Sequence, residues 1–449
     1  MKPSTIQTFS MLRLCVSVIT IVGYSASSSC AVTDNPNILI IFTDDQGYGD
    51  IGCYGNQKNK TPRLDRLAKE GTRFTSFYSQ AVCGPSRSAL LTGRHPIRSK
   101  GWGMPASEIT FAELISEVGY QTACIGKWDV SNRKPIIDRM PNAQGFEYYF
   151  GTLGANDNGK VDFHENNEKA GSTKDMGSLT KLYTDKAISF LKERRDPAKP
   201  FVLYVAHTMM HTVIDASDRF RGKSDGGLYG DVVEEFDFET GRLLDTLDDL
   251  KLAQNTLVIY TSDNGPWNQD RYTKNKKGHP KGSIFWGDSG PLRNGKGSPY
   301  EGGYRLPCIV RWPGRVPPAR TSDAIFATID FLPTFANLAG FEVPKDRRID
   351  GIDQTDLLLG KRESGRDHFY FTGAGVRKGR WKYLKPDAKF AGYATEDGRK
   401  KVDELYDLQS DIGEQINLAM KYPQTVADLK SMMLNIEAGD QLRPEDNKR

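Results

Sequence analysis

The chain is 449 residues long, which is enough for one large domain and a smaller one. Charged residues make up 26% of it and hydrophobic residues 38%, as in ordinary soluble globular proteins. The net charge is +4, which argues against binding to nucleic acid through bulk charge and leaves room for a local basic pocket.

Residues 1–31 are predicted to be a secretory leader. Two basic residues and a short apolar run at 14–22 come first, and the small residues at 29–31 offer a cleavage site. The run is too short to span a bilayer, and no later segment is apolar enough to do so. We therefore expect a secreted or periplasmic protein, with Cys30 as a weak site for a lipoprotein anchor.

Four apolar segments are predicted to be strands, and helices are predicted between them, at 62–71, 110–119, 178–194 and 231–250. Each strand ends in polar residues: 37–43 is followed by Asp44 and Asp45, 121–125 by Lys127 and Asp129, 201–206 by His207 and His211, and 256–262 by Asp263 and Asn264. Continuous apolar strands that alternate with helices indicate an α/β fold, with a large, mostly parallel central sheet flanked by helices.

A smaller C-terminal subdomain is predicted to follow. Strands at 368–372, 380–384 and 404–408 suit an antiparallel sheet, and 423–438 suits a helix packed on it. We place the α/β domain at 32–340 and the subdomain at 341–449. Segments 154–174 and 269–289 are predicted to be loops near the rim of the site.

A lone cysteine, Cys83, lies where a helix is predicted to begin. Pro85 suits a first helical turn, 86–91 reads as helix, and Gly93 suits its end. Free N–H groups and the helix dipole favour a thiolate, or an anion beside it, at such a position. The alternative is a small buried hydrophobic residue at a helix start.

The polar strand ends are predicted to form one site. Ligands of open α/β sheets bind outside the carboxyl ends of the strands, and clustered carboxylates repel one another unless a cation holds them together. All-oxygen ligands favour Ca²⁺ or Mg²⁺, although each acidic pair could instead be a turn. The oxygen donors are Asp44, Asp45, Asp263 and Asn264, and an anion could be bound by Arg87, Lys127, His211 and Lys296. His95 and His207 are predicted to be structural or peripheral.

The motif Cys83-Gly-Pro-Ser-Arg87, followed by Leu-Leu-Thr-Gly-Arg94, resembles the signature of the sulfatase family. The segments NILIIFTDDQGYGD, GKW, TLVIYTSDNGP, GPLRNGKGSPYEGGYRLP and ELYDLQSD resemble further sulfatase blocks, in family order. The resemblance implies an alkaline phosphatase-type fold and hydrolysis of sulfate monoesters, aryl or carbohydrate.

The same resemblance implies the roles of the site residues. Cys83 would be oxidised to formylglycine by a formylglycine-generating or anaerobic maturation enzyme, and its hydrate would attack sulfur and then expel sulfate. One Ca²⁺ would be bound by Asp44, Asp45, Asp263, Asn264 and residue 83. Arg87 would hold the formylglycine, Lys127 and Lys296 would bind sulfate oxygens, and His211 would bind sulfate or protonate the leaving alcohol.

One position departs from the family pattern. Sulfatases usually read Gly-Lys-Trp-His where this chain has Asp129, and that histidine is assigned as the base that releases sulfate. Three alternatives are open: Asp129 acts as the base, a neighbour such as His207 does so, or turnover is impaired.

Two alternative functions are also compatible with these residues. One is a phosphomonoester or phosphodiester hydrolase of the same fold, although the chain has only 6 histidines for the two-metal sites such enzymes often use. The other is a catalytically impaired protein that binds sulfated glycans. In each case the expected partner is a sulfated or phosphorylated small molecule or carbohydrate rather than nucleic acid.

Overall fold

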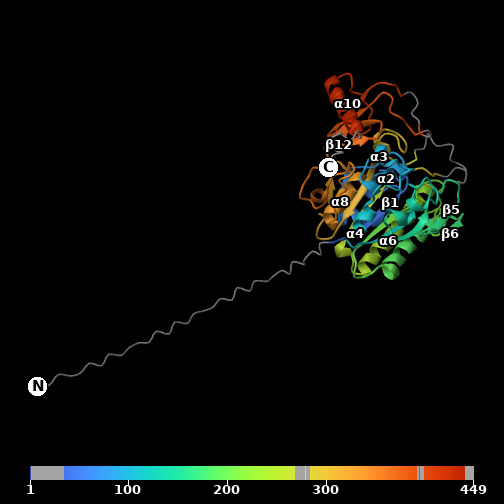
Figure 1. Cartoon of the computed structure of the whole chain (residues 1–449). Coiled ribbons are helices and arrows are strands. Elements are labelled where there is room, and N and C mark those ends of the chain that lie inside the picture. Colours follow the sequence, from blue (N-terminus) through green and yellow to red (C-terminus); the bar gives the residue numbers. More distant parts are fainter. Residues whose placement is uncertain (2–34, 268–278, 280–283, 392–393, 395–398, 440–449) are drawn as a thin grey trace. The chain divides into compact units, whose positions relative to one another are not determined.

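The computed structural model describes Met1 and residues 35–267, 279, 284–391, 394 and 399–439 (Figure 1). The predicted leader and most of the predicted loop at 269–289 lie outside the described residues. Asp34–Arg449 is grouped as one compact unit, distinct from Met1–Thr33. A search of the described helices for a membrane span, judged by length and apolar character, finds none.

The four predicted strands lie side by side in the centre of the large sheet. They are β1 (Asn37–Thr43), β3 (Gln121–Lys127), β7 (Phe201–Ala206) and β8 (Thr256–Ser262). Their order in the sheet is β8-β1-β7-β3, and every neighbouring pair is parallel. The carboxyl ends of all four therefore lie at the same edge of the sheet, which confirms the predicted fold class.

Helices cover both faces of this sheet. Alternate residues of each apolar central strand point to opposite faces, so both faces must be buried. Leu39 and Ile41 of β1 pack with residues of α1 (Pro62–Glu70), α5 (Leu179–Ser189) and α6 (Gly227–Asp249). Ile38, Ile40 and Phe42 pack on the other side with residues of α2 (Cys83–Thr92), α4 (Phe111–Glu117) and α8 (Phe331–Ala339). This double burial explains why β1 is apolar along its whole length.

Further strands extend the sheet to 11 within the described residues. They are β2 (Thr72–Tyr78), β4 (Tyr148–Thr152), β5 (Val161–Glu165), β6 (Glu168–Thr173), β9 (Arg305–Arg311), β10 (Arg320–Ser322) and β11 (Phe326–Ala327). β9 runs antiparallel to both β2 and β8, so the sheet is mixed beyond its parallel centre. The prediction of a loop over 154–174 is wrong for its second half, because β5 and β6 form a hairpin at the edge of the sheet.

A second sheet holds four antiparallel strands, in the order β12 (His368–Phe371), β13 (Gly375–Lys378), β14 (Trp381–Leu384) and β15 (Glu404–Asp407). Tyr370 of β12 faces Leu429 and Met433 of α10 (Pro423–Ala438), as predicted for a packing helix. Phe369 and Phe371 face the opposite way, toward aromatic residues next to the large sheet. The proposed division at 340/341 stays a prediction. The remaining short helices are α3 (Pro96–Ser99), α7 (Glu301–Tyr304) and α9 (Thr355–Leu358), and a π-helical turn at Phe190–Arg194 follows α5.

Candidate active site

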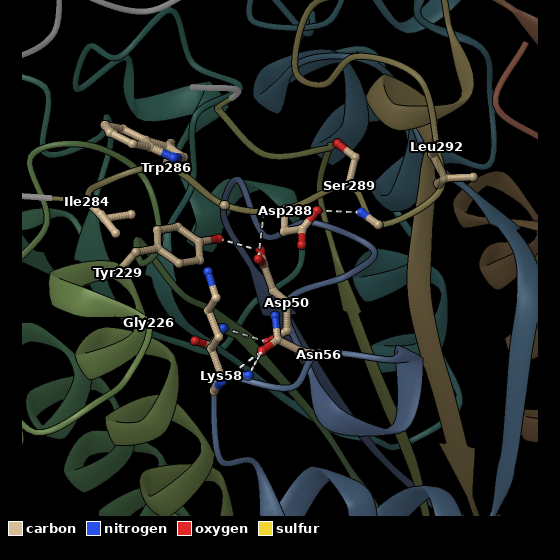
Figure 2. Close-up of a pocket in the computed structure, with 13 residues that line it drawn as sticks. Asp50, Asn56, Lys58, Gly226, Tyr229, Ile284, Trp286, Asp288, Ser289 and Leu292 are labelled. Atoms are coloured by element: carbon tan, nitrogen blue, oxygen red, sulfur yellow. Dashed lines mark hydrogen bonds between the residues drawn. The ribbon is translucent and has the colours of Figure 1, made fainter. Parts of the chain in front are cut away.

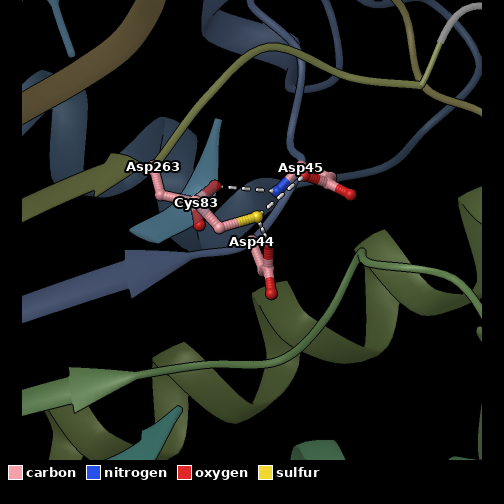
Figure 3. Close-up of side chains that lie close together, drawn as sticks. All are labelled: Asp44, Asp45, Cys83 and Asp263. Carbon is pink, nitrogen blue, oxygen red and sulfur yellow. Dashed lines mark hydrogen bonds between the residues drawn. The ribbon is translucent and has the colours of Figure 1, made fainter. Parts of the chain in front are cut away.

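Asp44 and Asp45, which follow β1, and Asp263, which follows β8, meet around Cys83 (Figure 3). Ligand atoms of Asp44, Asp45, Cys83 and Asp263 all lie within 4.8 Å of one another, and all four residues are buried. Because β1 and β8 are parallel neighbours in register, their C-terminal residues are brought to the same point. The backbone N–H of Asp45 donates to Oδ1 of Asp263 at 3.1 Å, which ties the two strand ends together.

Cys83 is the first residue of α2, as predicted, and Gly93 ends that helix with a φ of 66°. Its thiol lies 3.4 Å from Oδ1 of Asp44. Arg87 follows one helical turn later on the same face and is fully buried. Its guanidinium donates to Oδ2 of Asp263 at 2.9 Å and to the backbone carbonyl of Lys127 at 3.0 Å.

Asn264 presents an oxygen whose partner would be a cation. Its amide Nδ2 donates to Oδ1 of Asp45 at 2.6 Å and to the carbonyl of Gly265 at 2.9 Å. Its own Oδ1 is buried and has no hydrogen-bond partner among the described residues. A buried, unpaired carbonyl oxygen beside three carboxylates suits a hard cation such as Ca²⁺.

The surroundings shift the pKa values of Asp44 and Asp263 in opposite directions. Burial would raise the pKa of Asp44, but Lys127, His211 and Arg87 together hold it well below its ordinary value. Burial and the neighbouring Asp44 raise the pKa of Asp263 to about 7. Repulsion within the cluster is therefore strong without a cation, which is the condition that a bound divalent ion relieves.

Cys83 is a neutral thiol in this environment. Burial, and then the carboxylates of Asp263 and Asp44, raise its pKa well above the ordinary value. The expectation of a helix-stabilised thiolate therefore does not hold for the unmodified side chain, because desolvation and two negative neighbours outweigh the helix dipole.

Two lysines converge on the cluster from different segments. Nζ of Lys127, at the end of β3, donates to Oδ2 of Asp44 at 2.6 Å. Nζ of Lys296 donates to Oδ2 of Asp45 at 2.7 Å and lies 3.3 Å from Sγ of Cys83. Three carboxylates thus face three buried cationic side chains, counting Arg87. A divalent cation would give this group a net positive charge.

His211 completes the predicted set. Its Nε2 lies 3.7 Å from Oδ2 of Asp45 and 3.6 Å from Oδ1 of Asp157, and its Nδ1 lies 2.6 Å from the carbonyl of Thr212. Buried Asn156 fixes this loop by donating to the carbonyls of His211 and Val213. Burial would raise the pKa of Asp157, but His211 and Arg133 hold it below its ordinary value.

Asp129 lies beside the cluster, and each of its carboxylate oxygens accepts a hydrogen bond. Oδ1 accepts from Nε of Arg133 at 2.7 Å, and Oδ2 accepts from Nε1 of Trp102 at 3.1 Å. Oδ2 also lies 3.5 Å from Nζ of Lys127. Arg133 in turn donates to Asp157 at 2.7 Å. Trp102 and Arg133 were not predicted to be site residues, since no sequence motif singles them out.

His207 and His95, which were predicted to be structural or peripheral, both pack against aromatic side chains. The ring of His207 packs edge-on against Tyr183 and Phe236, and its Nδ1 accepts from the N–H of Met209. Burial lowers its pKa to about 4. His95 packs edge-on against Tyr370 of the small sheet.

Asp50, which follows the loop of Asp44 and Asp45 in the sequence, lies among residues that line a pocket, next to Tyr229 and Asp288 (Figure 2). Oδ2 of Asp50 accepts from the N–H of Gly47 and from Tyr229 Oη, each at 2.5 Å, and Oδ1 accepts from the N–H of Asp288 at 2.7 Å. Asp50, Tyr229 and Asp288 border a cavity of about 700 Å³. Asp50 was not predicted to matter, although it belongs to the same motif as Asp44.

Comparison with known families agrees with this geometry. A family model described as sulfatase matches residues 36–341. The chain belongs to the sulfatase family. A second model, described as the C-terminal part of N-sulphoglucosamine sulphohydrolase, matches residues 295–439. The protein is therefore a sulfuric ester hydrolase by family, as the sequence motifs predicted.

Individual sulfatases support the assignment over most of the chain. It is 36% identical to N-acetylgalactosamine-6-sulfatase of Canis lupus familiaris over 372 residues, covering 75% of this chain and 69% of that protein. It is 32% identical to N-acetylgalactosamine-6-O-sulfatase of Bacteroides thetaiotaomicron over 488 residues, covering 90% and 94%. A solved structure from work on glycosaminoglycan metabolism by Bacteroides thetaiotaomicron matches with a TM-score of 0.79 and 30% identity, covering 90% of this chain and 100% of that one.

Proposed function

We propose that this sulfatase hydrolyses a sulfate monoester on a sulfated carbohydrate of the glycosaminoglycan type, using a formylglycine made from Cys83 and one Ca²⁺. The observation that carries the proposal is the gathering of Asp44, Asp45 and Asp263 around the first residue of a helix, within 4.8 Å. The named activities of the two N-acetylgalactosamine 6-sulfatases support the choice of an amino-sugar sulfate as the first substrate to test.

The cation would be held by Asp44, Asp45, Asp263 and Asn264, with residue 83 as a further ligand. Bound there, Ca²⁺ supplies Lewis acidity and offsets the repulsion between the carboxylates. The buried Oδ1 of Asn264, which has no hydrogen-bond partner among the described residues, supports this assignment, because an unpaired buried carbonyl oxygen costs free energy that a cation would offset.

Residue 83 must become an oxygen nucleophile for this chemistry. The buried thiol of Cys83 is neutral, so it is a poor nucleophile as synthesised. The aldehyde hydrate of formylglycine offers one oxygen for attack on sulfur and a second hydroxyl for sulfate release. Arg87, which binds Asp263 from the same face of α2, would hold this residue in place.

Substrate binding would fall to the cationic side chains. Lys127 and Lys296 would bind sulfate oxygens, since each ammonium already lies within 3 Å of a carboxylate of the cluster. His211 would bind sulfate or give a proton to the leaving alcohol from Nε2, because its Nδ1 faces the carbonyl of Thr212.

For Asp129 we propose a positioning role in preference to that of a base. Its two oxygens already accept N–H donors from Arg133 and Trp102, and Lys127 lies 3.5 Å away. A carboxylate so engaged is poorly placed to take a proton, and it would orient Lys127 toward the sulfate instead.

Export and maturation complete the proposal. Residues 1–31 would direct the chain to a secreted or periplasmic location, with Cys30 as a weak lipoprotein site, and a maturation enzyme would modify Cys83 before folding buries it.

Peptide mass spectrometry on protein from the native host tests the central step. The peptide that spans Cys83 should have lost its sulfur and gained an aldehyde, whereas the peptides with Cys124 and Cys308, both buried free thiols, should be unchanged. Parallel assays with an aryl sulfate and an aryl phosphate then test the reaction. Faster hydrolysis of the phosphate by fully modified protein would favour the phosphoesterase alternative, and loss of both activities with retained glycan binding would favour the impaired one.

A further inference from the structure

Three exposed side chains lie at the border of the buried cluster near Asp129, and we call Trp102, Arg133 and Asp157 the rim group. Trp102 is 37% exposed, and the side chains of Arg133 and Asp157 are 39% and 43% exposed. They form a chain of contacts. Trp102 and Arg133 both donate to Asp129, and Arg133 also donates to Asp157 at 2.7 Å.

The rim group lies next to the reacting position on two sides. The indole of Trp102 covers Gly84, the neighbour of Cys83, so closely that a Cβ at position 84 would lie 2.3 Å from its Cδ1. Asp157 lies 3.6 Å from Nε2 of His211, the group proposed to face the leaving alcohol. A leaving group that extends out of the buried cluster would therefore meet these side chains first.

The charges of the rim group differ from those of the buried cluster. The guanidinium of Arg133 is shared between the carboxylates of Asp129 and Asp157, so it offers no surplus positive charge. Asp157 presents a half-exposed carboxylate, which accepts hydrogen bonds and cannot donate them when ionised. This surface suits hydroxyl groups and disfavours a second anionic group.

We propose that the rim group binds the sugar ring of the leaving group, with Trp102 against an apolar face of the ring and Asp157 accepting hydrogen bonds from its hydroxyls. The inference rests on the proposed function and adds a preference. The enzyme should favour a sugar that carries one sulfate and neutral hydroxyls over one that carries a second sulfate or a carboxylate near the scissile ester. Trp102 is held for this task by its bond to Asp129 and by the backbone bond from the N–H of Asn132 to its carbonyl.

Asp157→Asn tests the inference, because it removes the charge and keeps the shape. With fully modified enzyme, kcat/KM is measured on an aryl sulfate, on N-acetylgalactosamine 6-sulfate and on a disulfated form of the same sugar. We expect the loss on the monosulfated sugar to exceed the loss on the aryl sulfate by about 5-fold, because the amide still accepts a hydrogen bond but lacks the charge that strengthens it. The preference for the monosulfated over the disulfated sugar should also shrink, which a merely structural role would not cause.

Asp162→Asn is the matched control, since Asp162 is an exposed aspartate of the neighbouring β5 that pairs with Lys160. It should change none of the three rates. Equal losses on all substrates in Asp157→Asn, or an unaltered preference between the two sugars, would overturn the inference. A wild-type enzyme that cleaves the aryl sulfate but neither sugar would overturn it too and leave the sulfatase chemistry standing, whereas failure on all three substrates would count against the proposed function itself.

Discussion

Asn264 donates its side-chain amide to Asp45 at 2.6 Å and keeps its own carbonyl oxygen buried without a hydrogen-bond partner among the described residues. The two residues follow β8 and β1, and they lie 219 positions apart in the chain. The hydrogen bond couples one proposed metal ligand, which follows β8, to the orientation of another, which follows β1. Substitution of Asn264 therefore tests the proposed cation site without changing the charge of the cluster.

Removal of the cation should therefore abolish activity, and Asn264→Ala should weaken Ca²⁺ binding by about 10-fold or more, because one oxygen donor is lost and Asp45 loses its amide partner. The wild type should gain about 2.7 kcal/mol of stability at a Ca²⁺ concentration 100 times Kd. Calcium titration of chelator-treated protein by calorimetry, with thermal unfolding in parallel, measures both effects.

Asn37→Ala is the control for this experiment, since Asn37 is also a buried asparagine beside β8 but binds only Thr256 and the N–H of Phe201. It should lower stability and leave the Ca²⁺ affinity unchanged. Equal affinities for wild type and Asn264→Ala would remove Asn264 from the ligand set.

Asp129→Asn separates the positioning role from that of a base. Asparagine can still accept a hydrogen bond from Trp102, so we expect the rate of sulfate release from an aryl sulfate to fall by less than about 10-fold. A general base contributes about 10²–10⁴-fold, so a loss of that size in Asp129→Asn would restore the base hypothesis. Asp129→Ala should be more damaging than Asp129→Asn, because it also releases Arg133.

Glu414 should make stability depend on pH. It lies buried with Lys382 and Glu301, and Lys382 Nζ is 2.8 Å from Glu414 and 3.1 Å from Glu301. Burial raises the pKa of Glu414 to about 7, while Lys382, with Arg305 and Arg377, holds the pKa of Glu301 at about 2 despite its burial. The folded protein thus keeps a proton on Glu414 that the unfolded chain releases near its ordinary pKa.

A raised pKa contributes stability that is fully present below the unfolded value, about 4.5, and lost as pH rises through about 7. Glu414 alone should lower the free energy of unfolding by about 1.4 kcal/mol per pH unit in this window, and Asp50, Asp237 and Asp263, whose pKa values are also raised to about 7, should add to the fall. Urea unfolding at several pH values measures it. Glu414→Gln, whose amide oxygen can still accept from the N–H of Glu301, should reduce the slope by the share of one group, and an unchanged slope would contradict the assignment.

Gly47→Ala should disturb the metal site through the backbone. A Cβ there would lie 2.1 Å from the carbonyl oxygen of Asp288, which cannot move without breaking the contact between Asp288 and Asp50. We expect weaker Ca²⁺ binding together with lower stability, by the same titration. Gly413→Ala is the control, since its Cβ would meet nothing closer than 3.4 Å and both properties should be retained.

The motifs and the hydrophobic pattern were sufficient to predict the central strands and the gathering of the acidic residues around Cys83, while the identity of the metal ligands stays a prediction. β1, β7 and β8 match their predicted ranges, since strands buried on both faces must be continuously apolar. Parallel strands place their carboxyl ends at one edge of a sheet, so the sequence was sufficient to predict that Asp44 and Asp263 lie close together. The hairpin of β5 and β6 escaped prediction, because β6 is largely exposed and carries no apolar pattern.

The residue pattern predicted the kinds of chemical group: a cysteine at a helix start, oxygen donors at strand ends, and lysines beyond them. How these charges are paired depends on the folded chain. The protonation of Cys83, the double engagement of Asp129 and the sharing of Arg133 between two carboxylates all depend on burial and on distances between segments far apart in the chain. Desolvation and Coulomb energies act through space, and the order of residues along a chain does not record them.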